Sequence, residues 1–459
     1  MSAVLCIDVG STFTKGVLVD DADGALLSTA SHPTTIGTDV LDGVSAVREQ
    51  AERAAGLPAG TRAADVLACS SAGGGLRIAV VGYERQVTAE AGYRVALSAG
   101  GRVVHVHAGP LDGPGVSALR EARPDVVLLV GGTDGGNADV LLHNARRLAA
   151  VRITVPVVLA GNADAADEAR TALERTRRRV TVAANVLPRI GVLDPVPART
   201  AIREVFLRHV IGGKGLSRGP GFARLVRAAT PDVVLAGVEM LADGAPGHGV
   251  PRAGDVLVVD VGGATTDVYS VVTPRGDEAQ PRRDVVATLW RARTVEGDLG
   301  LRWNAPGVVE AALAERLVDP DAVADLRGRA LALAAHPGFV PGPGQAEAAA
   351  DDALLARLAV TVAARRHGRA ATPTSRTRPL REVSLVVGSG GVLRHACDGV
   401  RARILAPLLT DHGGGWTVPE HARLTVDARY TLFAAGLLAP HAPAAAARLA
   451  AAQLTPVIM

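Results

Sequence analysis

The chain has 459 residues, more than one ordinary hydrophobic core supports, so we expect two or three domains. Hydrophobic residues make up 48% of it, which excludes general disorder, and aromatic residues only 3%, so the core must consist mainly of Val, Leu, Ile and Ala. The formal net charge is +3 with acidic and basic residues well mixed, which gives no electrostatic case for nucleic-acid binding.

The N-terminal segment MSAVLCIDVGS lacks the basic region and cleavage site of a signal peptide, and no run of about 18 uncharged apolar residues occurs. Cys6, Cys69 and Cys397 are far apart and show no metal-binding spacing, which fits a reducing compartment. We therefore expect a cytoplasmic protein that does not bind a membrane.

The first expected elements are β-rich runs at 3–9, 14–20 and 25–30, followed by an amphipathic helix from Asp39 to Ala55. Apolar strands then alternate with helices, which predicts a parallel sheet with helices on its faces. These strands are expected at 65–69, 76–82, 102–107, 126–130, 154–160 and 179–184, and these helices near 87–99, 137–149 and 164–176.

Further helices are expected at 196–212 and 231–241, and the turn-rich stretch 242–254 indicates a boundary. A second β-rich start follows at 255–261 and 266–272. Helices dominate 308–370, and a strand is expected at 382–387. The last 50 residues are expected to be mostly helical, with Asp427 and Tyr430 in the last strand-to-helix turn.

The two β-rich starts form an internal repeat. Asp8-Val-Gly-Ser-Thr-Phe-Thr-Lys15 matches Asp260-Val-Gly-Gly-Ala-Thr-Thr-Asp267, and in each case an apolar strand ends in Asp, a Gly turn follows and hydroxyl residues precede a second strand. One such turn alone is equally well an ordinary hairpin, but the repeat and its matched flanks favour two homologous halves facing each other across a cleft.

Tight turns of small residues expose backbone N–H groups that bind phosphate oxygens. The sequence thus predicts a nucleotide site formed by Gly10, Ser11, Thr12, Thr14 and Lys15 of the first turn and Gly262, Gly263, Ala264, Thr265 and Thr266 of the second. Asp8 and Asp260 are predicted to hold Mg²⁺ through its water molecules and to be the catalytic residues, because Mg²⁺ uses few protein ligands.

A third glycine loop, Gly388-Ser389-Gly390-Gly391, ends a strand and opens a helix. Glycine there allows a ligand to approach the backbone closely. Because this loop comes last, after the two phosphate turns, it suits the adenosine part of ATP.

These residues carry a resemblance to a known superfamily. CIDVGSTFTK and VVDVGGATTDVYSV resemble the first and second phosphate motifs of actin, Hsp70 and the sugar kinases, and VVGSGGVLR resembles their adenosine motif. TVEGDLGLR, residues 294–302, is similar to the segment that follows the second phosphate loop in Hsp70-like members.

A narrower resemblance covers most of the length. LLVGGTDGGNADVLLHNARRL (128–148), VVLAGNADAADEAR (157–170) and RTVEGDLGLR are similar to the MutL-type accessory proteins associated with glutamate mutase. Their genes accompany adenosylcobalamin-dependent mutases, and members are regarded as ATPase-like helpers that protect or reactivate the mutase. The resemblance implies ATP and Mg²⁺ as cofactors and mutase subunits as partners.

The expected fold is α/β: duplicated actin-like, ribonuclease-H-like ATPase halves with an inserted parallel, Rossmann-like subdomain. We expect the first half at 1–95, the insertion at 96–195, connecting helices at 196–253 and the second half at 254–459. The function that fits is a slow ATPase with a chaperone-like role, and a small-molecule kinase of the same fold is the alternative. An actin-like filament is a third possibility, which the insertion disfavours.

Three features keep two interpretations each. The loop Gly131–Asn137 is either a ligand or partner loop or a turn that caps a helix. Glu296 and Asp298 either position water or metal or cap the next helix. Lys15, one of only two lysines among 49 Lys and Arg residues, is either selected for a compact charge beside a phosphate or retained by chance.

Overall fold

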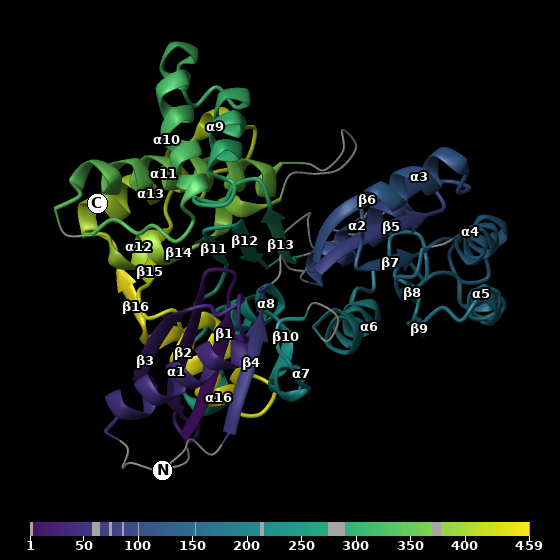
Figure 1. Ribbon diagram of the computed structural model, residues 1–459, viewed down its shortest axis with the longest axis horizontal. Coiled ribbons are helices and arrows are strands. Elements are labelled where there is room, and N and C mark those ends of the chain that lie inside the picture. Colours follow the sequence, from purple (N-terminus) through teal and green to yellow (C-terminus); the bar gives the residue numbers. More distant parts are fainter. Residues whose placement is uncertain are drawn as a thin grey trace. The chain divides into compact units, whose positions relative to one another are not determined.

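The computed structural model describes residues 3–56, 65–72, 76–84, 87–99, 101–151, 153–211, 215–273, 290–342, 344–369 and 378–458. The chain divides into two compact units. The first unit includes Met1–Gly74, Val233–Thr273 and Trp290–Met459, and the second unit includes Gly75–Asp232 (Figure 1). In the described parts of the chain, every helix is too short or too polar to cross a bilayer.

Four strands of the first unit, β1 to β4, lie in its N-terminal sheet in the order β3-β2-β1-β4. Their bounds are Leu26–Pro33, Phe13–Asp20, Ala3–Val9 and Asp65–Ser70. β1 pairs antiparallel with β2 and parallel with β4, and its seven residues are all buried, as expected of a central strand with both faces covered. Helix α1, Val40–Ala54, packs on β2 and β3.

The C-terminal sheet of the first unit has the order β13-β12-β11-β14-β15-β16. Its strands are Arg291–Glu296, Thr266–Val271, Val256–Val261, Leu385–Ser389, Arg423–Asp427 and Leu454–Pro456. β11 pairs antiparallel with β12 and parallel with β14, so β13-β12-β11-β14 repeats the arrangement β3-β2-β1-β4. The α/β class is confirmed, and these four strands of each sheet have the same order and pairing.

Helix α11, Ala346–Gly368, is the central helix of the C-terminal sheet's core and packs on β11, β12, α9 and α13. The other helices of this region are α9 Ala305–Ala314, α10 Val323–Ala335, α12 Gly391–His395, α13 Asp398–Leu405, α14 Pro407–Thr410, α15 Leu432–Leu438 and α16 Pro443–Ala452. α15 lies against β1 and β4, so a C-terminal helix completes the N-terminal sheet's core.

Helix α15 also meets α8, Thr230–Asp243, at two glycines. A Cβ atom on Gly237 would overlap the carbonyl oxygen of Leu432, and one on Gly436 would overlap that of Val233. Each glycine thus faces the carbonyl four residues before the other glycine, which makes the contact reciprocal. The two helices approach backbone to backbone at this point.

The second unit is built on a sheet of five parallel strands in the order β6-β5-β7-β8-β9. The strands are Gly101–Ala108, Leu76–Gly82, Val126–Leu129, Val157–Leu159 and Val180–Val182. Its helices are α2 Thr88–Ser98, α3 Gly113–Glu121, α4 Asp139–Ala150, α5 Ala166–Glu174, α6 Val196–Val205 and α7 Gly221–Leu225; π-helix Phe206–Ile211 follows α6, and strand β10, Val226–Ala229, follows α7.

The predicted grouping of 126–130, 154–160 and 179–184 in one parallel sheet is confirmed. β6 and β5 belong to the same sheet, and β5 lies within 1–95, the range predicted for the first ATPase half, so the sheet begins earlier in the chain than the predicted insertion at 96–195. The elements α3, α7, β10, β13 and β16 were not predicted from the sequence. The proline-containing sequence 373–379 predicts a loop, most of which lies outside the described residues.

Candidate functional site

The two predicted phosphate turns have the same local geometry. The Gly10 N–H donates to the Phe13 carbonyl at 3.1 Å, and the Gly262 N–H donates to the Thr265 carbonyl at 2.9 Å. A Cβ on Gly10 would lie 2.7 Å from the Phe13 oxygen, so this tight turn requires glycine. The repeat in the sequence is therefore a repeat in backbone structure.

The fold brings these turns together. A Cβ on Gly263 would lie 3.3 Å from the hydroxyl oxygen of Thr12, so the second turn faces the first. This Thr12 oxygen is buried and has no hydrogen-bond partner within the described structure. An unsatisfied buried hydroxyl between two glycine turns is the arrangement that a bound anion would complete.

The remaining turn residues differ in accessibility. Ser11, Ala264 and Thr265 are partly exposed. Thr14 and Thr266 are fully buried, and their hydroxyls bond inside the protein, to Thr34 at 3.1 Å and to the Leu299 carbonyl at 2.6 Å. The geometry fits a nucleotide contact better at the first three residues, and for all five this role stays a prediction.

The segment after β13 holds the second turn in place. The N–H groups of Leu301 and Arg302 donate to the carbonyls of Gly262 and Gly263 at 3.1 and 2.8 Å. Asn304 donates from its side-chain amide to the Ala264 carbonyl at 2.8 Å. The residues of the TVEGDLGLR motif thus support the loop and need not contact a ligand themselves.

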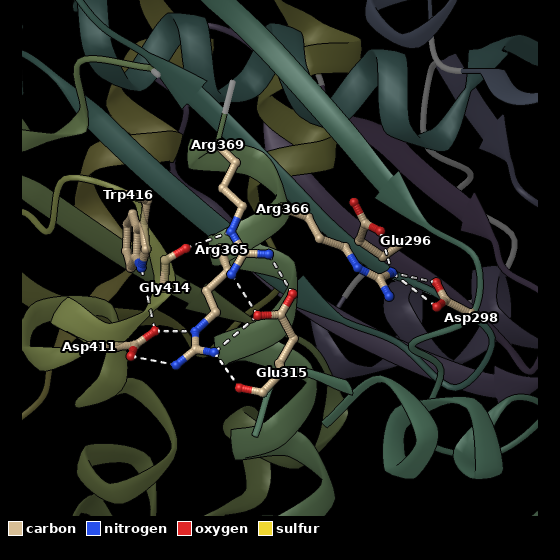
Figure 2. Close-up of polar contacts among 9 residues, drawn as sticks. All are labelled: Glu296, Asp298, Glu315, Arg365, Arg366, Arg369, Asp411, Gly414 and Trp416. Atoms are coloured by element: carbon tan, nitrogen blue, oxygen red, sulfur yellow. Dashed lines mark hydrogen bonds and ion pairs between the residues drawn. The ribbon is translucent and has the colours of Figure 1, made fainter. Parts of the chain in front are cut away.

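Glu296 and Asp298 face α11 (Figure 2). The Arg366 guanidinium donates at 2.8 Å to Glu296 and at 2.8 and 3.0 Å to the two carboxylate oxygens of Asp298. Burial raises the pKa of Glu296 against the opposing effect of Arg366. No side-chain capping bond joins either carboxylate to α9, so among the described contacts the arginine is their partner.

Two neighbouring arginines extend this network along α11 (Figure 2). Arg365 donates to both carboxylate oxygens of Asp411 at 2.7 and 2.8 Å and to Glu315 at 3.0 Å. Arg369 donates to Glu315 at 2.5 and 2.6 Å and to the Gly414 carbonyl. These pairs fix α11 to the segments after α9 and α14.

Asp8 lies at the end of β1, opposite Lys15 on β2 and Cys69 on β4. Its carboxylate is buried and accepts from the Tyr430 hydroxyl at 3.3 Å and from the Cys69 thiol at 3.6 Å. The Lys15 ammonium lies 3.9 Å from the same Asp8 oxygen that Tyr430 contacts. A negative group, a cation and a phenol thus meet beside the first turn.

Asp260 occupies the equivalent place at the end of β11, opposite Asp267 on β12 and Ser389 on β14. Removal of the carboxyl from water raises its pKa, although the residue keeps part of its exposure. Lys15 and a hydrogen bond from Ser389 oppose that rise, while the charges of Asp8 and Asp427 add to it. Asp8, Asp260 and Lys15 therefore lie within one electrostatic environment, as predicted for facing halves.

Sequence reasoning missed a buried polar group next to Asp260. Burial raises the pKa of Asp267 to about 6. Tyr269 donates to one oxygen of this carboxyl at 3.2 Å, while the other oxygen is buried without a hydrogen-bond partner in the described structure. Arg293 on β13 is only 1% exposed and its charge opposes the rise.

The third loop follows β14, as predicted. Gly390 has φ +107, and a Cβ there would overlap the Val261 carbonyl oxygen, so this position requires glycine. Ser389 is buried beside Asp260, whereas the space around Gly391 is open. This loop is thus adjacent to the second turn, and its open side at Gly391 is compatible with the predicted adenosine contact.

The fit of an ATP–Mg²⁺ complex to these residues follows from their chemistry. The unsatisfied Thr12 hydroxyl and the two glycine turns offer donors to phosphate, and the mutual repulsion of Asp8 and Asp260 would be relieved by a cation. Direct metal chelation is a different matter: the described residues contain no group of three or more His, Cys, Asp or Glu side chains arranged to hold a metal ion.

The GGTDGGN loop follows β7 in the second unit and is bonded internally. Asp134 accepts from the Asn185 amide at 2.8 Å and from the Ala163 N–H at 2.9 Å. Asn162 donates to the Gly136 carbonyl at 3.0 Å, and Asn137 accepts from the Asp139 N–H at the start of α4. Both interpretations of the loop keep support: Asn137 acts in the turn before α4, and the exposed backbone is rigidly presented.

The solved structures that match this chain over most of its length have low sequence identity to it. They include a glycerol dehydratase reactivase (13% identity, 95% of this chain and 99% of that one, TM-score 0.35) and the xylulose kinase from Bifidobacterium adolescentis (12% identity, 99% and 95%, TM-score 0.33). These TM-scores are low, and the fold assignment rests on the strand order of this chain.

Sequence comparison is more informative. The curated protein called Protein MutL from Clostridium tetanomorphum is 34% identical over 470 residues, covering 98% of each chain. The family model described as MutL protein matches residues 4–454. The chain therefore belongs to the MutL protein family.

Proposed function

We propose that this protein binds and slowly hydrolyses ATP and acts as an accessory or reactivating protein for an adenosylcobalamin-dependent mutase in the cytoplasm. The observation that carries the nucleotide part is the approach of two matched glycine turns, with Thr12 opposite Gly263 and with Asp8, Asp260 and Lys15 in mutual electrostatic reach. Membership of the MutL family supports the accessory role.

Each residue has a defined task in this proposal. The backbone N–H groups of both turns and the Thr12 hydroxyl bind phosphate oxygens, and Lys15 offers a compact positive charge to them. Asp8 and Asp260 bind Mg²⁺ through water, and the bound ion supplies charge stabilisation to the phosphates. The GSGG loop at 388–391 binds the adenosine part.

The test uses Asp8→Asn and Asp260→Asn, which preserve shape and remove charge. ATP binding is measured by titration calorimetry with and without Mg²⁺, and turnover by phosphate release. We expect both variants to bind ATP to within about tenfold of wild type and to lose Mg²⁺-dependent turnover by roughly a hundredfold. Wild-type turnover in either variant would contradict the assignment.

The same assay separates an accessory ATPase from a small-molecule kinase. An accessory protein hydrolyses ATP slowly without any acceptor and changes its rate when mutase subunits are added. A kinase consumes ATP only with its acceptor present. Acceptor-dependent ATP consumption that is indifferent to the mutase would contradict the accessory role.

A further inference from the structure

Tyr430 contacts two residues of the proposed nucleotide site, Asp8 and Lys15, although the sequence assigned it no role. It follows β15 and precedes α15, and it is 6% exposed. Its backbone φ is +57, a left-handed conformation that is common for glycine and uncommon for a bulky residue such as tyrosine. Backbone conformations of this kind cost free energy and are found most often at functional sites, where the surrounding structure holds the residue in place.

The turn around Tyr430 is firmly held. Asp427 accepts from the N–H groups of Thr431 and Leu432 at 2.8 and 3.0 Å, and the Tyr430 N–H donates to the Asp427 carbonyl at 3.2 Å. The Phe433 ring packs against Tyr430 with 5.2 Å between ring centres. The tyrosine side chain is therefore presented by a rigid turn.

Both polar ends of the first phosphate hairpin contact this side chain. The Lys15 ammonium lies 3.6 Å from the centre of the Tyr430 ring, which is the geometry of a cation–π contact. The Tyr430 hydroxyl donates to Asp8 at 3.3 Å. Arg394 lies farther from the same ring, at 5.6 Å, so Lys15 is the closer cation.

A lysine side chain has four rotatable carbon bonds and is only loosely positioned by one ion pair. The Asp8 oxygen at 3.9 Å is a weak restraint, and the Lys15 side chain is 24% exposed. The ring therefore supplies the restraint that the carboxylate lacks. Because Tyr430 comes from the end of the chain and Lys15 from its start, the lysine's place depends on correct docking of the two sheets.

We propose that Tyr430 is the positioning residue of the nucleotide site: its ring face fixes the Lys15 ammonium and its hydroxyl fixes the Asp8 carboxylate. This inference rests on the proposed ATP site for its functional meaning, but the contact itself is testable without nucleotide. Tyr430 does not act on the phosphates; it acts through Lys15 and Asp8.

The lysine content of the chain allows a direct measurement. Lys15 and Lys214 are its only lysines, so full-length protein labelled with ¹³C- and ¹⁵N-lysine gives two sets of side-chain NMR signals. Protons over an aromatic ring are shifted upfield, so we expect one upfield-shifted Cε set in the nucleotide-free wild type. Lys15→Arg assigns that set by removing it, and the Lys214 set is the internal reference.

Two variants separate the ring from the hydroxyl. Tyr430→Phe keeps the ring, so the shifted lysine signals should persist, while Tyr430→Leu should return them to ordinary positions. Tyr83→Leu in the second unit is the matched control and should leave the upfield-shifted Lys15 set in place. A wild-type spectrum without a shifted set, or a shift that survives Tyr430→Leu, would overturn the proposal, and the wild-type spectrum requires no variant to fold.

Kinetics then connect the contact to function. Tyr430→Leu should raise the KM for ATP by roughly tenfold, whereas Tyr430→Phe should leave it within about twofold and instead raise the Mg²⁺ concentration needed for half-maximal turnover. In a double-mutant cycle, Tyr430→Leu should raise the KM for ATP little further when Lys15 is already Ala, because the ring acts on this KM by holding the Lys15 ammonium. Fully additive effects would contradict positioning. Absence of any ATPase activity, with the NMR shift present, would reject the proposed function and leave the contact established.

Discussion

At the scale of single residues, Lys15 shows how chemistry selects one cation over another. Its ammonium lies between the Tyr430 ring and the Asp8 carboxylate, at 3.6 and 3.9 Å. A planar guanidinium is wider and cannot take the same place without moving one of them. We expect Lys15→Arg to lower ATP turnover markedly and Lys15→Ala to lower it by roughly a hundredfold, measured by phosphate release.

Circular dichroism of both Lys15 variants is the control for folding. Wild-type turnover in Lys15→Arg would leave chance retention as the better explanation of a lysine in this arginine-rich chain.

The Asp267 carboxyl provides a prediction about pH. Burial raises its pKa from the ordinary value of 3.8 to about 6. This difference corresponds to roughly 3 kcal/mol by which the folded protein favours the protonated over the ionised carboxyl. Between these two pH values the folded protein holds a proton that the unfolded chain has released, so the stability contributed by this group falls as the pH rises. Asp267→Asn removes this dependence.

We therefore expect the thermal midpoint of Asp267→Asn to rise relative to wild type between about pH 4 and pH 7. The measurement is the difference between the two midpoints at each pH. A difference that stays constant across this range would show that Asp267 titrates normally.

The sequence was informative about the glycine turns because their chemistry is local, and uninformative about the residues that come from elsewhere. Asp8 and Lys15 stand out beside a Gly-Ser-Thr turn, whereas Tyr430 is more than 400 residues away from them and belongs to a motif with no distinctive neighbours. Its contact with Asp8 depends on how two sheets pack. The sequence places Tyr430 at the last strand-to-helix turn, but no neighbouring residue there indicates a role.

At the scale of elements, strand β13 shows why one part of the fold escaped prediction. Its sequence, RARTVE, contains two arginines and a glutamate and does not resemble a half-buried strand. Arg293 is nevertheless buried, with its guanidinium carbon 5.7 Å from the centre of the Tyr269 ring. Its positive charge also lowers the pKa of Asp267 against the effect of burial. Tertiary charge compensation overrode the local pattern, whereas β1 and β11 were predicted because their apolar runs need no such partner.

The arginines of α11 make a prediction about how helices are held. Arg365 is 7% exposed on its side chain and binds Asp411 and Glu315, both largely buried (Figure 2). Its removal leaves two carboxylates without their cation in a poorly solvated place. We expect Arg365→Ala to destabilise the first unit by roughly 3 kcal/mol or more, seen as a loss of several degrees in thermal midpoint.

Arg327→Ala is the matched control, since Arg327 pairs with Glu310 on the surface at a similar distance of 2.7 Å. We expect no measurable change in its thermal midpoint. Equal losses in the two variants would mean that burial does not decide the strength of these pairs.

At the scale of the whole molecule, we propose that the second unit binds the mutase of the proposed function. Three exposed apolar residues lie at the start of α6 and in the segment before it. Their exposed fractions are 64% for Ile190, 45% for Val192 and 62% for Val196. The neighbouring Pro188 carbonyl accepts from the N–H of Asp134, so the rigid GGTDGGN loop adjoins them. Exposed apolar side chains beside ordered polar backbone are typical of protein interfaces.

We expect the double variant Ile190→Ser, Val196→Ser to weaken mutase binding by at least about tenfold in surface plasmon resonance, with ATP turnover unchanged. The double variant Leu331→Ser, Val340→Ser changes two residues of the first unit that are 55 and 58% exposed, and it should bind the mutase normally. Loss of binding in the control pair alone would move the interface to the first unit.

The crossing of α8 and α15 has a consequence for how relatives of this chain can vary. At most helix contacts, a larger side chain on one helix is tolerated when its neighbour becomes smaller, and the two positions change together. Gly237 and Gly436 each face a carbonyl oxygen, which no substitution can shrink. Neither position can compensate for the other, so each should stay glycine on its own account. Among relatives, the pair should show the unusual combination of direct contact and no covariation.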